Sequence, residues 1–335
     1  MIVPLFCSNV KKFSERDLTI GKIVLLLSLY SHFLLAFRLE ENLMEVVILL
    51  AVLTLLHSFQ TLFCTLYTSR YPGKGELASP VFCVLQSIVI ALFTWIAGGF
   101  PKEAALLTVI FGVLNAMMLF GFNTSLIKAG SLGSYAFMNM MLLFGGILVP
   151  VIYSALFVEG ETLGKWQILA IGLMLLAFVL MNIKEIRLKG IKPIYYVYCG
   201  LLFLCNGFYG TLLKMQSVHY GEQKDMMVVI SYALMGVIAL AQLCMKEGKS
   251  TFKAFALGKK AILPLLLSLV SSALAINVLT RVMPLADVAT LFTVDNGGVL
   301  VLAATYSFVI FKEKPNVNKL LAMALAVVSI LIFSL

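Results

Sequence analysis

Residues 284–314 read PLADVATLFTVDNGGVLVLAATYSFVIFKEK, an apolar run of helical length with an acid, Asp295, near its middle. A charged side chain at the centre of a bilayer-spanning helix costs about 2.5–3.5 kcal/mol even on insertion scales. A chain keeps such a residue where the side chain faces a partner or a water-filled path. This stretch therefore predicts a membrane helix with a polar site at its centre.

The same pattern occurs once earlier in the chain. Residues 131–161 are also apolar, with a pair of glycines at the middle and an acid at the end. Gly145 precedes Gly297 by 152 positions, and Glu161 precedes Glu313 by the same number. This shared spacing predicts a duplicated helical unit, against the alternative of chance similarity between two apolar regions.

The composition is that of a membrane protein. Of 335 residues, 61% are hydrophobic and 12% are charged, and the mean hydropathy is +1.02, whereas soluble domains are about 45–50% apolar and about 25% charged. A span needs roughly 20 apolar residues, and backbone groups in lipid must be bonded within the segment. We therefore expect an all-α polytopic membrane protein.

The net charge of +9 does not indicate nucleic acid as a partner. The lysines and arginines lie between apolar runs, where membrane topology and anionic lipids explain them better. Six scattered cysteines without a CxxC pair predict neither disulfides nor a metal site.

Ten apolar segments are separated by short polar or turn-forming connections. They lie at about residues 44–67, 79–98, 104–122, 133–157, 165–182, 194–213, 226–244, 260–280, 285–311 and 317–335. A further segment, 19–37, is just long enough to span.

The repeat extends to the front of each unit. His57 and Gln60 precede Asn206 and Tyr209 by 149 positions. Each unit then holds five spans, and the odd number means that the second copy enters the membrane from the opposite side. We expect two inverted five-helix repeats, a common plan of secondary transporters.

The predicted organisation has four parts. They are an N-terminal extension (1–43), a first repeat (44–182), a linker (183–193) and a second repeat (194–335). The sequence leaves two readings of the extension open: an eleventh helix, or a segment upstream of a true start at Met44.

Polar residues gather on one face of the first predicted helix of the repeat. Thr54, His57, Gln60, Thr61 and Cys64 follow three-and-four spacing, which puts them on one side of a helix. The candidate substrate-binding or ion-binding residues are Asp295, Asn296, His57, Gln60, Asn206 and Tyr209. A lined cavity and plain interhelical hydrogen bonding are the two readings of such polar faces.

Asp295 lies about ten residues into its helix, too deep to reach the membrane surface easily. It would bind a cationic substrate or a proton, or it is an acid neutralised by its neighbours. His57 would exchange protons near neutral pH, or it is a neutral hydrogen-bonded imidazole. Two glycine pairs, Gly145-Gly146 and Gly297-Gly298, favour close helix crossings, with a bend at the site as the alternative.

No motif of catalysis occurs. The chain lacks GxSxG, HExxH, a phosphate-binding loop and metal-ligand spacing of Cys and His. We therefore expect no enzyme activity and no cofactor.

The sequence resembles the EamA-like ten-helix branch of the drug/metabolite transporter superfamily over residues 44–335. The first unit carries Glu161-Thr162-Leu163, Trp166-Gln167 and Gly172. The second keeps Glu313 but has Pro315, Lys319 and Ala324 where the family pattern differs.

The resemblance implies a multi-pass protein of the inner or plasma membrane that moves a small polar metabolite, such as an amino acid, by alternating access. The central cavity would lie between the two inverted halves, with protons as a candidate coupling ion. The alternative is a non-transporting accessory or scaffold protein on the same fold. The substrate, the direction of transport and the oligomeric state stay open.

Basic residues concentrate on one predicted side of the membrane. That side holds the connections near Arg70, in 183–193 and in 245–259, while the other holds Lys102, Lys165, Lys214, Lys224 and Arg281. The richer side should be cytoplasmic, which puts the C-terminus outside and departs from the family, whose members have both ends in the cytoplasm.

Overall fold

The computed structural model describes residues 41–72, 75–132, 135–160, 163–182, 193–309 and 317–332. Within these ranges every regular element is a helix. The α-helices are α3 (Glu41–Arg70), α4 (Gly75–Ala97), α5 (Leu106–Leu132), α6 (Tyr135–Phe157), α7 (Lys165–Asn182), α8 (Pro193–Tyr220), α9 (Lys224–Glu247), α10 (Lys259–Val282), α11 (Val288–Val309) and α12 (Val317–Ile332). Two short 3-10 helices, η1 (Gly221–Gln223) and η2 (Gly248–Phe255), flank α9. The all-α expectation is confirmed for these residues, while segment 19–37 and linker residues 183–192 lie outside them.

Five of these helical stretches are long and apolar enough to cross a membrane. They are Met44–Thr68, Leu77–Ala97, Leu106–Ser125, Pro193–Glu247 and Lys259–Val282. The fourth comprises α8 and α9 with η1 between them. Shorter apolar helices occur at Met141–Phe157, Lys165–Leu180, Val288–Leu302 and Leu320–Ile332.

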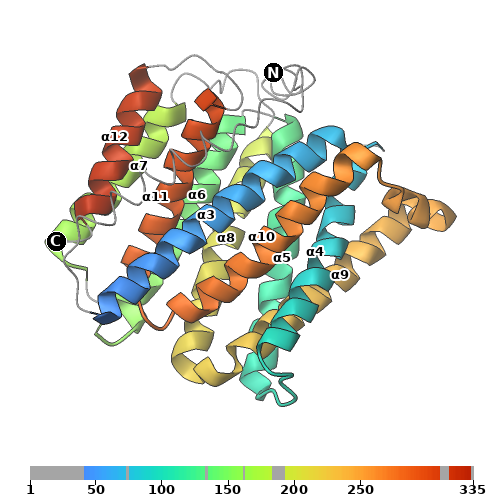
Figure 1. The fold of residues 1–335 in the computed structure, drawn as a ribbon, viewed down its shortest axis with the longest axis horizontal. Coiled ribbons are helices and arrows are strands. Elements are labelled where there is room, and N and C mark those ends of the chain that lie inside the picture. Colours follow the sequence, from blue (N-terminus) through green and yellow to red (C-terminus); the bar gives the residue numbers. More distant parts are fainter. Residues whose placement is uncertain are drawn as a thin grey trace.

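The helices form one tilted bundle (Figure 1). Helices α3 and α10 run side by side across its middle, and α8 packs against both α5 and α6. The pair α4 and α9 forms one end of the bundle, and the pair α7 and α12 forms the other. Helix α11 packs against α3, α6 and α12, so α11 joins the middle of the bundle to one end.

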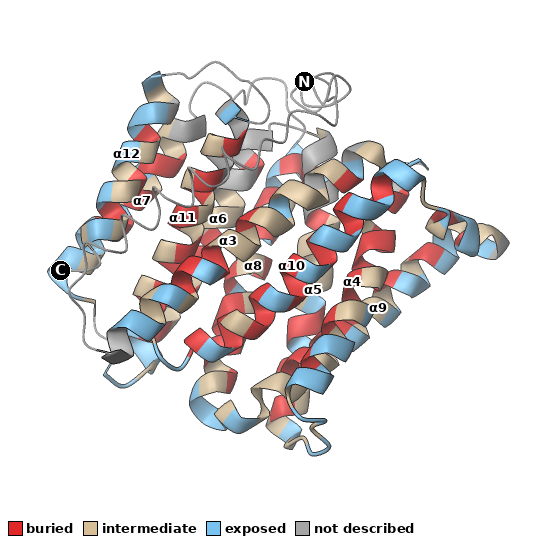
Figure 2. Ribbon diagram, viewed as in Figure 1, coloured by how far each residue is buried: buried red, intermediate tan, exposed pale blue. Residues whose placement is uncertain are grey.

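Buried residues follow the helix faces that look into the bundle, and exposed residues lie on the outward faces (Figure 2). The largest apolar cluster draws on α3 (Leu53), α6 (Ile147), α7 (Met174) and α9 (Met235). Many large apolar side chains remain exposed on the outward faces, among them Leu106 at 78%. The helices are therefore apolar both inside the bundle and around it, as expected of helices surrounded by lipid.

Two helices run further than the apolar pattern predicts. Helix α5 continues ten residues past 122 and α8 seven residues past 213. The extension of α8 is stable because Gln216 is buried and donates from Nε2 to Thr108 Oγ1 of α5, at 3.2 Å. Packing against a neighbouring helix thus continues α8 through polar sequence.

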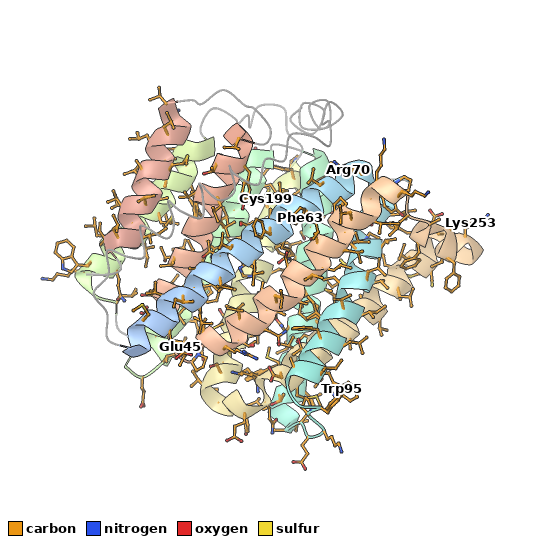
Figure 3. The ribbon with its side chains drawn as sticks, viewed as in Figure 1. Glu45, Phe63, Arg70, Trp95, Cys199 and Lys253 are labelled. Atoms are coloured by element: carbon orange, nitrogen blue, oxygen red, sulfur yellow. The ribbon has the colours of Figure 1, made fainter. Side chains whose placement is uncertain are left out.

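The bundle has two distinct edges. In Figure 3, Arg70, Cys199 and Lys253 lie toward one edge, and Glu45 and Trp95 lie toward the opposite edge. Arg70 and the connection that carries Lys253 thus share a side, in line with the grouping of basic connections expected from the sequence.

The closest helix crossing gives a stability prediction. A methyl group at Gly145 would overlap the backbone of Phe203 on α8, which has no side-chain rotamer available to relieve the contact. We expect Gly145→Ala to lower the free energy of unfolding by about 1–3 kcal/mol, measured as a lower thermal midpoint in detergent. The matched control is Gly172→Ala on α7, where the added methyl meets nothing within 4 Å and higher helix propensity favours alanine. Equal midpoints for the two variants would contradict this reading of the crossing.

Candidate functional site

The centre of the site is a contact between α3 and α11. His57 Nδ1 lies 2.7 Å from Asp295 Oδ2, across 238 positions of sequence. The Asp295 side chain is 8% exposed and that of His57 is 27% exposed. Asp295 is thus enclosed by the bundle, while the imidazole retains partial access to its surroundings.

The second carboxylate oxygen of Asp295, Oδ1, differs from Oδ2 in its hydrogen bonding. Oδ1 is buried and has no hydrogen-bond partner within the described part of the chain. Buried polar atoms are nearly always hydrogen-bonded, and an unpaired one carries a desolvation cost of about 1–3 kcal/mol, or more when charged. The atom is therefore available to accept a hydrogen bond from a ligand.

Two threonines extend this group of buried acceptors. Thr54 Oγ1 and Thr293 Oγ1 are also buried without a partner among the residues described. Thr54 lies one helical turn before His57, and its side chain contacts α11 at Gly298. Thr54 and His57 of the polar stripe predicted on α3 thus face α11 at the level of the acid.

A second polar contact brings in α6 and α8. Asn206 Nδ2 donates to the backbone oxygen of Leu142 at 3.0 Å, and Asn296 Nδ2 donates to that of Phe292 at 2.8 Å. A methyl group added at Gly146 would lie 2.6 Å from Asn206 Nδ2 and 3.6 Å from Asn296 Oδ1. Both amides therefore lie beside Gly146, whose lack of a side chain leaves room for them.

Tyr209 links the site to α9. Its hydroxyl interacts with that of Tyr232, and it lies within electrostatic range of the Asp295 carboxylate. Four candidates from the predicted second repeat, Asp295, Asn296, Asn206 and Tyr209, thus gather near His57. Tyr232 was not among the predicted residues, because a lone tyrosine in an apolar helix gives no signal of its partner.

Gln60 stands apart from this cluster. It lies about one turn beyond His57 on α3, and its backbone oxygen accepts a hydrogen bond from Ser268 Oγ of α10 at 3.0 Å. Near it, Ser58 Oγ and Tyr306 OH are 3.0 Å apart, a contact that the sequence did not indicate. Both contacts hold α3 in place beside the site.

The four predicted glycines all lie at helix contacts. Gly145 and Gly146 face α8, while added methyls at Gly297 and Gly298 would meet Met174 of α7 and Thr54 of α3. Asp295 precedes these last two on α11, so their small size brings α3 and α7 close around the acid.

Metal chemistry gains no support from the described residues, among which no group of three or more His, Cys, Asp or Glu could hold an ion.

The pair of His57 and Asp295 predicts a measurable energetic coupling. His57→Ala leaves a buried acid without its partner, for which losses of about 3–5 kcal/mol are typical. Asp295→Asn keeps the size of the side chain and removes the charge, so it should be tolerated better. In a double-mutant cycle on unfolding free energy, the coupling should be at least about 1 kcal/mol. Additive costs would contradict a direct interaction, and Val52→Ala, at an exposed site on the same helix, serves as the control.

Comparison with known proteins establishes the fold but not the family. No family model matches the chain, and no curated protein matches it. One solved structure, which carries only the description "Crystal structure of protein", is similar to this chain. The match covers 87% of this chain and 96% of the solved chain, with a TM-score of 0.67 and 16% sequence identity. The likeness shows that this arrangement of helices also exists in an experimentally solved structure.

Proposed function

We propose that this protein is a secondary transporter that moves a small polar metabolite, such as an amino acid or a related compound, across a membrane by alternating access. The observation that carries the proposal is the contact of half-buried His57 with the enclosed Asp295 at the centre of an apolar bundle. Ionisable groups in this setting mark substrate paths, ion paths and proton relays.

The surface of the bundle supports a position within the bilayer. Large apolar side chains are exposed on its outward faces, including Leu106, Ile168, Val237 and Leu263. Exposed apolar patches of this extent are rare on monomeric soluble proteins. Lipid would cover them, and we propose the inner or plasma membrane as the location.

The helix contacts support an inverted duplication. If α3–α7 correspond in order to α8–α12, the contact of α3 with α10 has its counterpart in that of α8 with α5. The contact of α3 with α11 likewise corresponds to that of α8 with α6. The pairs α4–α9 and α7–α12 are then contacts of equivalent helices, as expected around a pseudo-two-fold axis.

Individual side chains support the same register. Gln86 Nε2 donates to Ser272 Oγ at 3.2 Å, and Asn123 Nδ2 lies 3.7 Å from Met235 Sδ. Met235 follows Gln86 by 149 positions, and Ser272 follows Asn123 by the same number. The two contacts are thus equivalent under the spacing that relates the repeats.

These features favour the EamA-like branch as the family of this chain. The halves would rock against each other around the fixed polar site, as inverted-repeat transporters do. Asp295 Oδ1 would accept a proton or the cationic group of a substrate, and His57 would compete for the same carboxylate. Asn206, Asn296 and Tyr209 would then orient the polar part of the substrate.

Substitution of Asp295 tests the proposed transport activity. Asp295→Asn preserves the shape of the side chain but not its titration or charge. We expect transport by purified protein in liposomes to fall by at least about tenfold, equivalent to about 1.4 kcal/mol. Thermal stability of the variant should stay close to that of the wild type.

Asp225→Asn is the matched control, since Asp225 lies in the first turn of α9, away from the site. A fully active Asp295→Asn protein would remove the proposed role of the acid. A wild-type protein that moves no metabolite across a broad panel would favour the accessory or scaffold alternative.

The two edges of the bundle allow a topology test. In a cysteine-free background, Ser250→Cys lies in η2 and Glu103→Cys lies on the connection before α5. An impermeant thiol reagent applied to intact cells should label Glu103→Cys and spare Ser250→Cys, because the more basic side faces the cytoplasm. The reverse pattern would invert the proposed orientation.

A further inference from the structure

The connection between α9 and α10 is the most strongly basic short stretch that the structure describes outside the site. Residues 245–260 contain five lysines and a single acid, Glu247. Most of this connection is η2, which lies at the edge of the bundle that also carries Arg70 (Figure 3). Positive charge is therefore concentrated at the level where the helices would leave the membrane.

η2 is held rigidly against the bundle by one side. Thr251 and Ala254 are buried, and the Tyr71 hydroxyl donates to the backbone oxygen of Ala254 at 2.7 Å. Burial and the nearby Glu247 raise the pKa of Tyr71, so its hydroxyl remains a donor at neutral pH. The opposite side of η2 is consequently presented outward in a fixed orientation.

That outward side combines apolar anchors with cations. Phe252 is 85% exposed and Met245 is 81% exposed, the two largest values among the exposed apolar residues. Lys246 at the end of α9, Lys253 in η2, and Lys259 and Lys260 at the start of α10 are exposed along the same stretch. An aromatic anchor surrounded by lysines is the pattern of segments that lie in the headgroup layer of a membrane.

A recess adjoins this face. A cavity of about 280 Å³ opens among η2 and the ends of α3, α4 and α9, with Tyr71, Ser250 and Lys253 in its lining. Pockets for drug-sized ligands run from about 300 to about 1,000 Å³, so this cavity suits a small polar headgroup better than a whole metabolite. Glu247 also lines the cavity and would repel a phosphate group. We therefore expect the phosphate to lie beside Lys253.

We propose that this η2 face (Met245, Lys246, Phe252, Lys253, Lys259 and Lys260) binds the headgroups of anionic phospholipids in the adjoining leaflet. Lysine clusters immediately beyond a membrane helix are attracted to anionic lipid. The proposal requires insertion in a membrane but is independent of whether the protein transports anything.

The test is a lipid titration of the full-length protein in detergent, followed by thermal unfolding. Phosphatidylglycerol should raise the unfolding midpoint more than phosphatidylcholine with the same acyl chains. The difference should shrink as salt rises, because ions screen exposed charges. Replacing Lys246, Lys253 and Lys259 by glutamine should weaken the apparent affinity for phosphatidylglycerol by at least about tenfold, equivalent to about 1.4 kcal/mol.

The matched control replaces three lysines of the other predicted side, Lys102, Lys165 and Lys224, by glutamine. This control protein should keep the response of the wild type to phosphatidylglycerol. Phe252→Ser should weaken the response while the charges remain. Equal responses of the wild type to both lipids, or equal losses in the two triple variants, would overturn the proposal. So would binding of a soluble acidic polymer as tight as that of the lipid, which would indicate an acidic protein as the partner.

Discussion

A carboxylate enclosed by apolar helices is costly to bury, and the imidazole of His57 is the contact that compensates for it. An uncompensated buried charge loses its hydration without replacement, so Asp295 requires a partner from another helix. That requirement fixes the rotation of α3 relative to α11 and the depth at which they cross. The small residues after Asp295 allow the approach, and Ser58, Gln60 and their partners keep α3 in register along its length.

The existence of the helices could be read from the sequence because apolar runs of span length have few alternatives in a chain so poor in charge. The ends were harder to predict. Lys214 and Gln216 interrupt the apolar pattern of α8, but both are buried by packing against neighbouring helices, and no local signal encodes that burial. Helix ends in such a bundle are set by tertiary contacts that a linear pattern does not contain.

The candidate site could also be predicted only in part. Asp295, His57 and Asn206 could be singled out individually, since polar residues in apolar helices are conspicuous. Their mutual placement could not, because the two members of the central pair are 238 positions apart. The repeat spacing pointed to matching positions in the two halves, but the closest contacts join α3 to α11 and α8 to α6, across the halves. Gln60 shares the face of His57 on α3 and still lies beside a different helix, so a common face did not suffice to assign it to the site.

The two predicted halves differ at the pair of helix contacts that correspond under the repeat spacing. The contact of α3 with α11 joins His57 to an acid, whereas the corresponding contact of α8 with α6 joins Asn206 to a backbone oxygen. Two identical inverted halves would make the inward-open and outward-open states mirror images with equal free energy. The contact of Asp295 with His57 in one half and the contact of Asn206 with a backbone oxygen in the other would remove this degeneracy. Only a ligand with unequal affinity for the two states shifts such an equilibrium. If the protein alternates between two such states as proposed, the unlike contacts of His57 and Asn206 would make one state lower in free energy than the other, even with no substrate bound.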